Sequence, residues 1–303
     1  MRPRRGWHPW LMLGPSLAVL VVFFLLPVAL AAYQSFFAWD LLTPPEYVGT
    51  ANYRALAAGG ELWKILGRTL GFSAMVVAGA MSLGLALAVL LNRPGRLFAL
   101  VRASIFSAYV VSWVAVALLW MWMLDPDGGI VAALFRALGL PRVGWLTDPD
   151  VVLATLAGVT VWKITGYTMI VFLAGLQSVP PSLLEAAALD GAGGFARFRY
   201  VTWPLLRPTA AFVATTSLVV SFQAFDVVRI MTQGGPTKAT TLFVYAIYEQ
   251  VFLNLSVGKA SALTVVFFTV LFAIAAGQLR VWRARAHTRA SAGGAASDDA
   301  GDA

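Results

Sequence analysis

Six long apolar stretches dominate the sequence, and short segments that hold most of its charged residues separate them. They run approximately over residues 10–33, 69–91, 104–124, 152–176, 209–228 and 260–281. A helix needs about 20 apolar residues to cross the hydrocarbon core of a bilayer, and each stretch has that length. Only 12% of the 303 residues are charged, against about 25% in soluble domains. The sequence therefore predicts an all-α integral membrane protein with six transmembrane helices within residues 10–285.

The first apolar stretch has two interpretations, because a basic start followed by an apolar run also marks a secretory signal peptide. The segment MRPRRGWHP precedes it, and the small residues ALAA near its end resemble a cleavage site. However, the run is longer than the roughly 7 to 15 residues usual in a signal peptide. We therefore interpret it as a retained first span, with residues 1–9 as a cytoplasmic N-terminal segment.

The basic residues indicate how the spans are oriented. Most of the 22 Lys and Arg residues precede the first span, lie between spans two and three or spans four and five, or follow the sixth. Loops on the cytoplasmic side carry an excess of Lys and Arg. The sequence therefore predicts that both termini and the segment between spans four and five are cytoplasmic. Residues 286–303 are small, polar and low in complexity, which predicts a disordered cytoplasmic tail.

Several classes of function lack the residues that they need. The chain has no cysteine, and His8 and His287 stand near its opposite ends, so no Cys or His metal site is predicted. The sequence contains no phosphate-binding loop, no nucleophile elbow and no zinc-protease motif. The net charge of +8 flanks the apolar stretches rather than forming one patch, which argues against nucleic-acid binding. We therefore predict no catalytic or metal site and no cofactor held by this chain.

Ionisable residues inside the spans bear on the source of energy for transport. Lys163 is the clear example, and no paired carboxylates occur within a span. Carriers driven by protons or sodium usually bury carboxylates or broken helices at mid-membrane. A transporter of this composition would draw its energy from a partner. A self-powered secondary carrier and a non-transporting membrane scaffold are the alternatives.

The stretch EAAALDGAGG, residues 185–194, is short, polar and rich in small residues between two apolar spans. Pro180 and Pro181 end span four, and Ser182 with Glu185 has the Ser-x-x-Glu spacing of a capping box. Gly191 can end a helix in a left-handed conformation. These signals predict a rigid helix of about two turns. It could be a plain interfacial connector, or an element that docks against another protein.

The same stretch resembles the EAA loop of ABC importer permeases, over residues 180–208. In that family the loop forms a coupling helix that sits in a cleft of a cytoplasmic ATPase subunit. The resemblance therefore implies a dimer of ATPase subunits as partner, which binds the ATP and Mg²⁺, and a place in the bacterial cytoplasmic membrane. It assigns the coupling role to Glu185, Ala186, Ala187, Asp190, Gly191, Ala192, Phe198 and Pro204.

Other motifs resemble the carbohydrate class of these permeases, the maltose and glycerol-3-phosphate type. They are GTANYRAL at 49–56, WMLDPDGGIVAAL at 122–134, an F-x-x-F-D segment before a GGP turn, and a late G-x-A-S-A run. The resemblance covers nearly the whole chain and implies the type I importer architecture. It also implies a second, homologous permease, an extracytoplasmic substrate-binding protein and surrounding lipid as partners. The turn Gly234, Gly235 and Pro236 is expected to face the binding protein.

The chain departs from this class in span three. Members commonly have proline at positions that correspond to Ala108, before Tyr109, and to Trp113, after Ser112. Proline is a common cause of sharp helix kinks. The sequence therefore predicts that two kinks are lost in this span.

A substrate path would lie near mid-membrane, where aromatic rings stack on sugars and amides or hydroxyls bond to them. The polar residues of these spans could equally join one helix to another, and Lys163 could extend toward the interface. A sugar, a sugar phosphate or a glycerol phosphate would suit this class. The candidates in spans four and five are Trp162, Lys163, Tyr167, Thr168, Ser217, Ser221 and Gln223.

Overall fold

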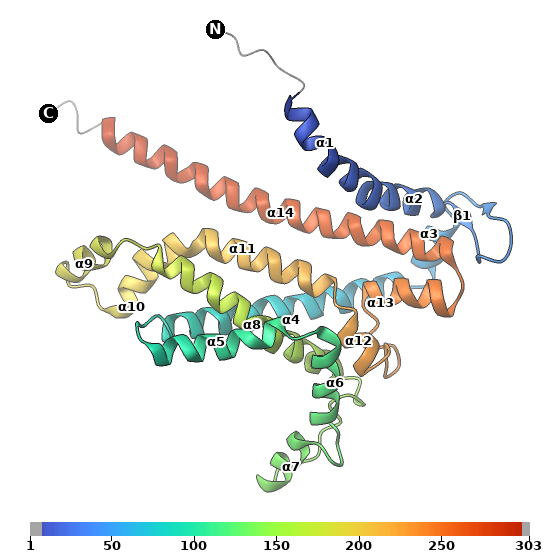
Figure 1. The fold of residues 1–303 in the computed structure, drawn as a ribbon, viewed down its shortest axis with the longest axis horizontal. Coiled ribbons are helices and arrows are strands. Elements are labelled where there is room, and N and C mark those ends of the chain that lie inside the picture. Colours follow the sequence, from blue (N-terminus) through green and yellow to red (C-terminus); the bar gives the residue numbers. More distant parts are fainter. Residues whose placement is uncertain (1–7, 299–303) are drawn as a thin grey trace. The chain divides into compact units, whose positions relative to one another are not determined.

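The computed structural model describes residues 8–298, which form mainly helices (Figure 1). Within this part, five helices are long and apolar enough to cross a membrane, and a sixth span consists of two helices bent by 100°. The prediction of six spans is therefore confirmed, with the third one broken. The predicted cytoplasmic segments 1–9 and 286–303 stay predictions, and residues 1–7 and 299–303 of them lie outside the described part.

The spans have these bounds. Span one comprises α1 (His8–Leu20), a π-helical turn (Val21–Leu25) and α2 (Leu26–Gln34), span two is α4 (Glu61–Leu90), and span three is α5 (Arg96–Val110) with α6 (Trp113–Met123). Span four is α8 (Val152–Gln177), span five ends with α11 (Trp203–Phe222), and span six lies in α14 (Val257–Asp298). The connections hold β1 (Phe37–Ala38), β2 (Glu46–Tyr47), α3 (Ala51–Ala58), α7 (Ile130–Ala137), α9 (Pro181–Leu189), α10 (Gly194–Arg197), α12 (Asp226–Met231), α13 (Phe243–Tyr248) and a π-helical turn (Glu249–Leu253).

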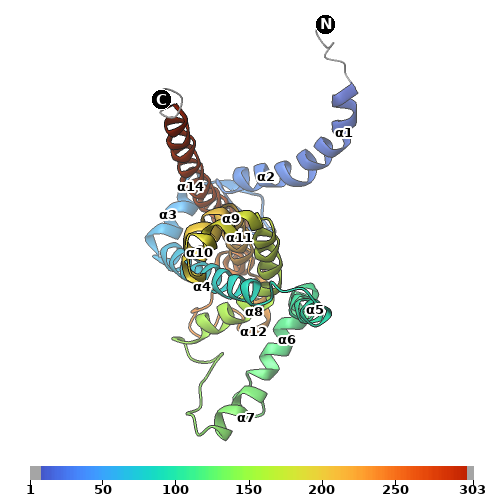
Figure 2. The same cartoon turned by 90° about the vertical axis from the view of Figure 1, so that its left-hand side faces the viewer.

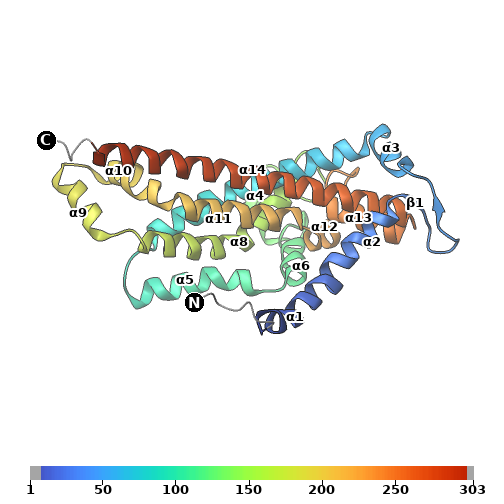
Figure 3. The same ribbon diagram turned by 90° about the horizontal axis from the view of Figure 1, so that it is seen from above.

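The chain divides into two compact units. The first combines the described residues up to Lys64 with Ala246–Val270, and the second combines Ile65–Tyr245 with the described residues from Leu271 onward. In the second unit α9 and α10 lie at one end of α8 and α11, while α6 and α12 lie at the other end (Figures 1 and 3). Figure 2 views the second unit from the end that carries α9 and α10.

Two of the quoted motifs meet in the first unit. The Asn52 side chain, from GTANYRAL, is buried and donates to the carbonyl oxygens of Ser35 and Phe37, each at 2.9 Å. Gly258, from the G-x-A-S-A run, lies against the same Phe37 carbonyl, and a Cβ there would clash with it. The Val257 N–H donates to the Trp39 carbonyl at 2.9 Å. We call this junction of Asn52, Phe37 and Gly258 the Asn52 clasp.

Replacing Asn52 with alanine is expected to destabilise the protein by about 1–3 kcal/mol, because two carbonyls lose their donor in a buried position. The midpoint of thermal unfolding in detergent measures the effect. Arg54→Ala, on the exposed side of the same helix, is the matched control and should leave the midpoint unchanged. Equal midpoints for both variants would show that the clasp contributes nothing.

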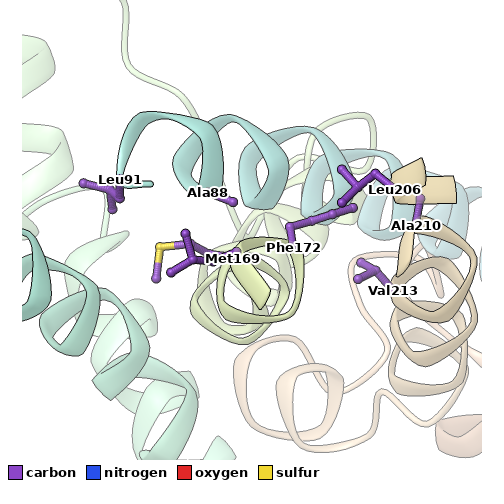
Figure 4. Packing of buried hydrophobic residues seen from close by; sticks show 8 residues of the cluster. Ala88, Leu91, Met169, Phe172, Leu206, Ala210 and Val213 are labelled. Atoms are coloured by element: carbon purple, nitrogen blue, oxygen red, sulfur yellow. The ribbon is translucent and has the colours of Figure 1, made fainter. Parts of the chain in front are cut away.

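The core of the second unit lies where α4, α8 and α11 meet (Figure 4). Phe172 of α8 is fully buried there, between the other two helices. The buried residues of α8 lie on several sides of the helix, as expected for a helix that is apolar on all faces. Members of this cluster are Ala88, Leu91, Met169, Phe172, Leu173, Leu206, Ala210 and Val213.

Glycines allow close approach to α8. A Cβ at Gly166 would lie 2.7 Å from the Cα of Phe106 on α5 and would also meet the Ile105 carbonyl oxygen. On α4, a Cβ at Gly84 would collide with the Thr168 side chain. Small residues serve this purpose in membrane helices, because they let backbones come together where no hydrophobic effect drives association.

Span three corrects the prediction that the kinks are lost. Helix α5 ends at Val110, and α6 begins at Trp113 after a bend of 100°. Val111 and Ser112 are extended, with ψ of 144° and 141°. The span is thus sharply broken without proline, so the missing prolines do not imply a straight helix.

Span five also differs from its predicted bounds of 209–228. A continuous helix starts at Gly194 and passes through α10 and a π-helical turn (Phe198–Thr202) into α11, which ends at Phe222. Val228 belongs to the separate helix α12. The residues that join α11 to α12 are mostly apolar, so hydropathy does not reveal the break. Pro204 lies in the first turn of α11, where proline is tolerated.

The WMLDPDGG motif forms the turn between α6 and α7. The Asp125 carboxylate accepts hydrogen bonds from the N–H groups of Gly128 at 2.7 Å and Asp127 at 3.0 Å. These two bonds hold the pKa of Asp125 below its ordinary value, because they favour the charged form. The motif is therefore explained by local turn geometry.

Candidate functional site

Helix α9 begins differently from the predicted capping box. Its N-cap is Pro180, Pro181 occupies the first turn, and no side chain caps its start. The fixed φ of proline suits the first helical position, so the helix starts before Ser182 and encloses it. The predicted Ser182–Glu185 capping box is therefore wrong.

The end of α9 confirms the role of Gly191 as a helix terminator. Gly191 has φ of +81°. Its N–H donates to the Ala188 carbonyl at 3.1 Å, and the Ala192 N–H donates to the Ala187 carbonyl at 2.9 Å. These two bonds form a Schellman motif, which satisfies carbonyls that the helix leaves unpaired.

The loop around α9 exposes both polar and apolar side chains. Leu189 is 89% exposed and Phe195 is 81% exposed, and Tyr200 is also exposed. Large exposed apolar residues of this kind mark a surface that contacts another protein or lipid. Of the eight predicted coupling residues, the exposed ones are Glu185, Ala186, Asp190 and Gly191, and the half-buried ones are Ala187, Ala192, Phe198 and Pro204.

A cavity of about 310 Å³ lies between α5, α8 and α11. The rings of Tyr109 and Tyr167 are stacked in its wall, with centroids 5.0 Å apart and planes inclined by 21°. Ser217 also lines it, and its buried hydroxyl has no hydrogen-bond partner among the described residues. An unpaired buried polar group is costly, so a polar partner at this hydroxyl would be favourable. We call this space the tyrosine cavity.

A second cavity, of about 250 Å³, adjoins the tyrosine cavity, because Val220 lines both. Trp113, Gln223 and Asp226 line it. An indole ring, an amide and a carboxylate are the side chains that bind sugar rings and hydroxyls. The structure thus joins two predicted candidates, Tyr167 and Ser217, in one cavity and places Gln223 beside it.

Three other candidates lie away from these cavities. Trp162 packs edge-on against Trp120 and borders a separate apolar cavity. The Thr168 hydroxyl is buried and donates to the Ala80 and Thr165 carbonyls. The Ser221 hydroxyl donates to the Leu218 carbonyl of its own helix at 2.7 Å.

Sequence reasoning missed two residues of the cavity walls, Tyr109 and Trp113. Tyr109 follows Ala108, and Trp113 is itself the second of the two positions at which the family resemblance leads one to expect proline, so this departure was the signal that could have identified them. Tyr109 lies near the end of α5 and Trp113 begins α6, so the two rings flank the bend, and each lines one of the two cavities.

Lys163 is 1% exposed and turned toward the break in span three. Its Nζ donates to the carbonyl oxygens of Ala108 at 3.3 Å, Tyr109 at 3.1 Å and Val111 at 2.5 Å. It therefore binds the backbone at the end of α5.

The GGP turn is closed by its own hydrogen bonds. The Thr240 hydroxyl donates to the Gly235 carbonyl at 2.8 Å, and the Tyr245 hydroxyl donates to the Gln233 carbonyl at 2.8 Å. Gly234 is buried with φ of +81°, and a Cβ there would lie 2.6 Å from the Tyr245 ring. Gly235 and Pro236 are half-buried, so Thr237 and Lys238 are the exposed residues of this turn.

Within residues 8–298, no group of three His, Cys, Asp or Glu side chains is placed to hold a metal ion.

Comparison with known proteins relates this arrangement to transport systems. Residues 80–285 match the family described as "Binding-protein-dependent transport system inner membrane component". The sn-glycerol-3-phosphate transport system permease protein UgpA of Agrobacterium fabrum is 33% identical over 283 residues, which cover 92% of this chain and 96% of the relative. The sulfoquinovosyl glycerol transport system permease protein SmoG of the same organism is 32% identical over 91% of this chain and 90% of its own length.

Solved structures share the fold. A chain of a bacterial alginate ABC transporter, crystallised with an alginate pentasaccharide-bound periplasmic protein, has a TM-score of 0.78 at 23% identity. The match covers 91% of this chain and 93% of that chain. A chain of the MetNI methionine ABC transporter matches with a TM-score of 0.53 at 18% identity, over 74% of this chain and 97% of that chain.

Proposed function

The chain belongs to the binding-protein-dependent transport system inner membrane component family, as an ABC importer permease of the carbohydrate class, and from this premise we propose the path that its substrate takes. The substrate passes through the tyrosine cavity and the adjoining cavity that Trp113, Gln223 and Asp226 line. The observation that carries the proposal is the Tyr109–Tyr167 stack beside the unpaired buried hydroxyl of Ser217. Aromatic faces and a hydroxyl suit a carbohydrate or a related solute.

The substrate class follows from the same chemistry and from the relatives. Those relatives are named for sn-glycerol-3-phosphate and sulfoquinovosyl glycerol, and the structural neighbour for alginate. We propose a sugar, a sugar phosphate or a glycerol phosphate for this chain. No catalytic step is assigned to the chain itself, and it holds no cofactor.

Partners supply the energy and the substrate. A dimer of ATPase subunits, which binds ATP and Mg²⁺, engages α9 and the exposed Leu189 and Phe195. A second, homologous permease completes the pathway, and an extracytoplasmic binding protein delivers the substrate at the side of the GGP turn. The exposed apolar side chains around α9 support this docking, as does the capped end of the helix at Gly191.

The orientation follows from charge. Arg197, Arg199 and Arg207 lie beside α9 and at the start of span five, which favours the cytoplasmic side for this end. Both termini then lie in the cytoplasm, and the chain is a multi-pass protein of the bacterial inner membrane.

Vesicle reconstitution tests the proposal. The chain, its second permease, the ATPase and the binding protein are purified together, and uptake of labelled glycerol phosphate and sugars is measured with and without ATP. ATP-dependent uptake supports the proposal. Uptake by this chain alone would identify a secondary carrier, and failure of any ATPase to co-purify would favour a scaffold.

The cavity residues predict a specific loss in this assay. Ser217→Ala and Tyr167→Ala are expected to reduce uptake at least tenfold at low substrate concentration, since a good polar contact or ring stack contributes about 1.4 kcal/mol or more. Ser221→Ala is the matched control, because this serine is buried on the same helix but bonds only to its own backbone. Similar losses at Ser217 and Ser221 would contradict the assignment of the cavity.

A further inference from the structure

Lys163 is a buried cation within a membrane span, and such residues are costly unless their charge is satisfied. No ion pair within the described residues involves it. Because an uncompensated charge would not persist here, its neighbours have to provide the compensation.

Those neighbours are the last carbonyls of α5. The three acceptors, Ala108, Tyr109 and Val111, lie at the C-terminal end of this helix, where carbonyls lack intrahelical partners. This end also carries the negative pole of the helix dipole, which favours a cation. An ammonium group has three N–H donors, so each can serve one carbonyl.

Aromatic rings complete the environment of Nζ. It lies 4.8 Å from the centroid of the Trp113 ring and 5.9 Å from that of the Tyr109 ring. Both distances fall within the range of cation–π contacts. One side chain of α8 therefore contacts residues on both sides of the break in span three.

We propose that Lys163 is a positioning residue: it stabilises the bent backbone between α5 and α6 and thereby keeps the Tyr109 ring stacked on the Tyr167 ring. The break contains no proline, so a contact from another helix has to stabilise the end of α5. Gly166 lies one turn further along α8, on the side that contacts α5, and its missing side chain lets the two backbones approach closely. With its three donors engaged, Nζ shapes the substrate cavity rather than binding the substrate. The role in transport rests on the proposed function, whereas the role in the fold does not.

Spin labels on α5 and α6, the two helices that the bend joins, test this role in the assembled transporter. The chain has no cysteine, so cysteines at Leu100 and Trp122 are unique labelling sites in this subunit. Each native side chain is 65% exposed, on α5 and α6 respectively. Pulsed electron paramagnetic resonance then measures the distribution of distances between the labels.

The original chain is expected to give one narrow distance peak. In Lys163→Met the new side chain has a similar length but neither donor nor charge, so the peak should broaden or shift and uptake should be abolished. Lys163→Arg should retain a narrow peak, because the guanidinium group has five N–H donors that can bind the same carbonyls. Thr155→Val is the control, because this hydroxyl on α8 bonds only to its own helix.

An unchanged peak in Lys163→Met would overturn the proposal, and uptake lost with the peak unchanged would mean that Lys163 contacts the substrate directly. If the methionine variant does not assemble, Lys163→Gln decides, because its amide retains two donors without a charge. A narrow, unshifted peak in that variant together with lost uptake would count against the proposal. The distances do not depend on the substrate, so this result is separable from failure of the proposed function.

Discussion

Replacing Gly191 with valine is expected to abolish ATP-driven uptake while the four kinds of subunit still assemble. Gly191 has φ of +81°, a conformation that costs an L-residue about 1–2 kcal/mol and a β-branched residue more. Valine would disrupt the two hydrogen bonds that end α9 and change the direction of the chain into α10. As the proposed coupling helix, α9 would then transmit the movement of the ATPase poorly. Uptake and substrate-stimulated ATP hydrolysis in reconstituted vesicles measure the loss.

Two variants make this result interpretable. Gly193→Ala changes a glycine in the same loop with φ of −67°, which any residue adopts, and uptake should be unchanged. Gly191→Asn should retain most of the uptake, because asparagine tolerates the left-handed conformation better than other residues do. Full uptake in Gly191→Val would refute the lever role of α9, and equal losses in Gly191→Val and Gly193→Ala would indicate a packing effect instead.

Replacing Gly166 with alanine is expected to disrupt the packing of α5 on α8. The added Cβ would meet backbone atoms of Ile105 and Phe106, which cannot turn away as a side chain can. Helices that are forced apart in this way lose roughly 1–3 kcal/mol of stability. The tyrosine cavity, whose wall includes Tyr109 of α5, would be distorted at the same time. Thermal unfolding in detergent and uptake in vesicles measure the two effects.

Gly158→Ala is the control for this change, because it lies on the same helix and a Cβ there meets no atom within 4 Å. It should leave uptake unchanged and the thermal midpoint equal or slightly higher, because alanine has the higher helix propensity. A thermal midpoint for Gly166→Ala equal to that of Gly158→Ala would show that the close approach of α5 and α8 does not stabilise the fold.

The features that follow from local sequence were predictable. Long apolar runs predict spans because lipid offers the backbone no hydrogen-bond partner, so each run has to form a helix. Gly191 could be identified because few other residues end a helix in the left-handed conformation. Both depend on residues close together in the chain.

Features that depend on distant contacts were not predictable. The break in span three at Val111 is bound by Lys163, 52 residues further along, so nothing in the span itself reveals its partner. The capping box failed for a local reason, because Pro181 starts α9 before Ser182. A matching pattern was present, but a stronger helix-start signal preceded it.

The candidate site was predicted only in part, because α8 is apolar on all sides and its sequence does not indicate which face lines a cavity. Tyr167 faces the cavity, whereas Thr168, the next residue, points to α4. Adjacent residues on a helix point in directions about 100° apart, so a correct span still leaves the orientation of each side chain open.

The Asn52 clasp has a consequence for biosynthesis. Asn52 and Phe37 leave the ribosome about 200 residues before Gly258, which packs against the Phe37 carbonyl that Asn52 binds. The first compact unit therefore reaches its final packing only after the start of span six has been synthesised. Contacts between residues so far apart in sequence are slow to form because the intervening chain has to be closed first. A chain truncated before residue 257 should accordingly insert its first five spans. Its first compact unit would still lack the packing against Gly258 and would be exposed to the quality-control proteases of the cell.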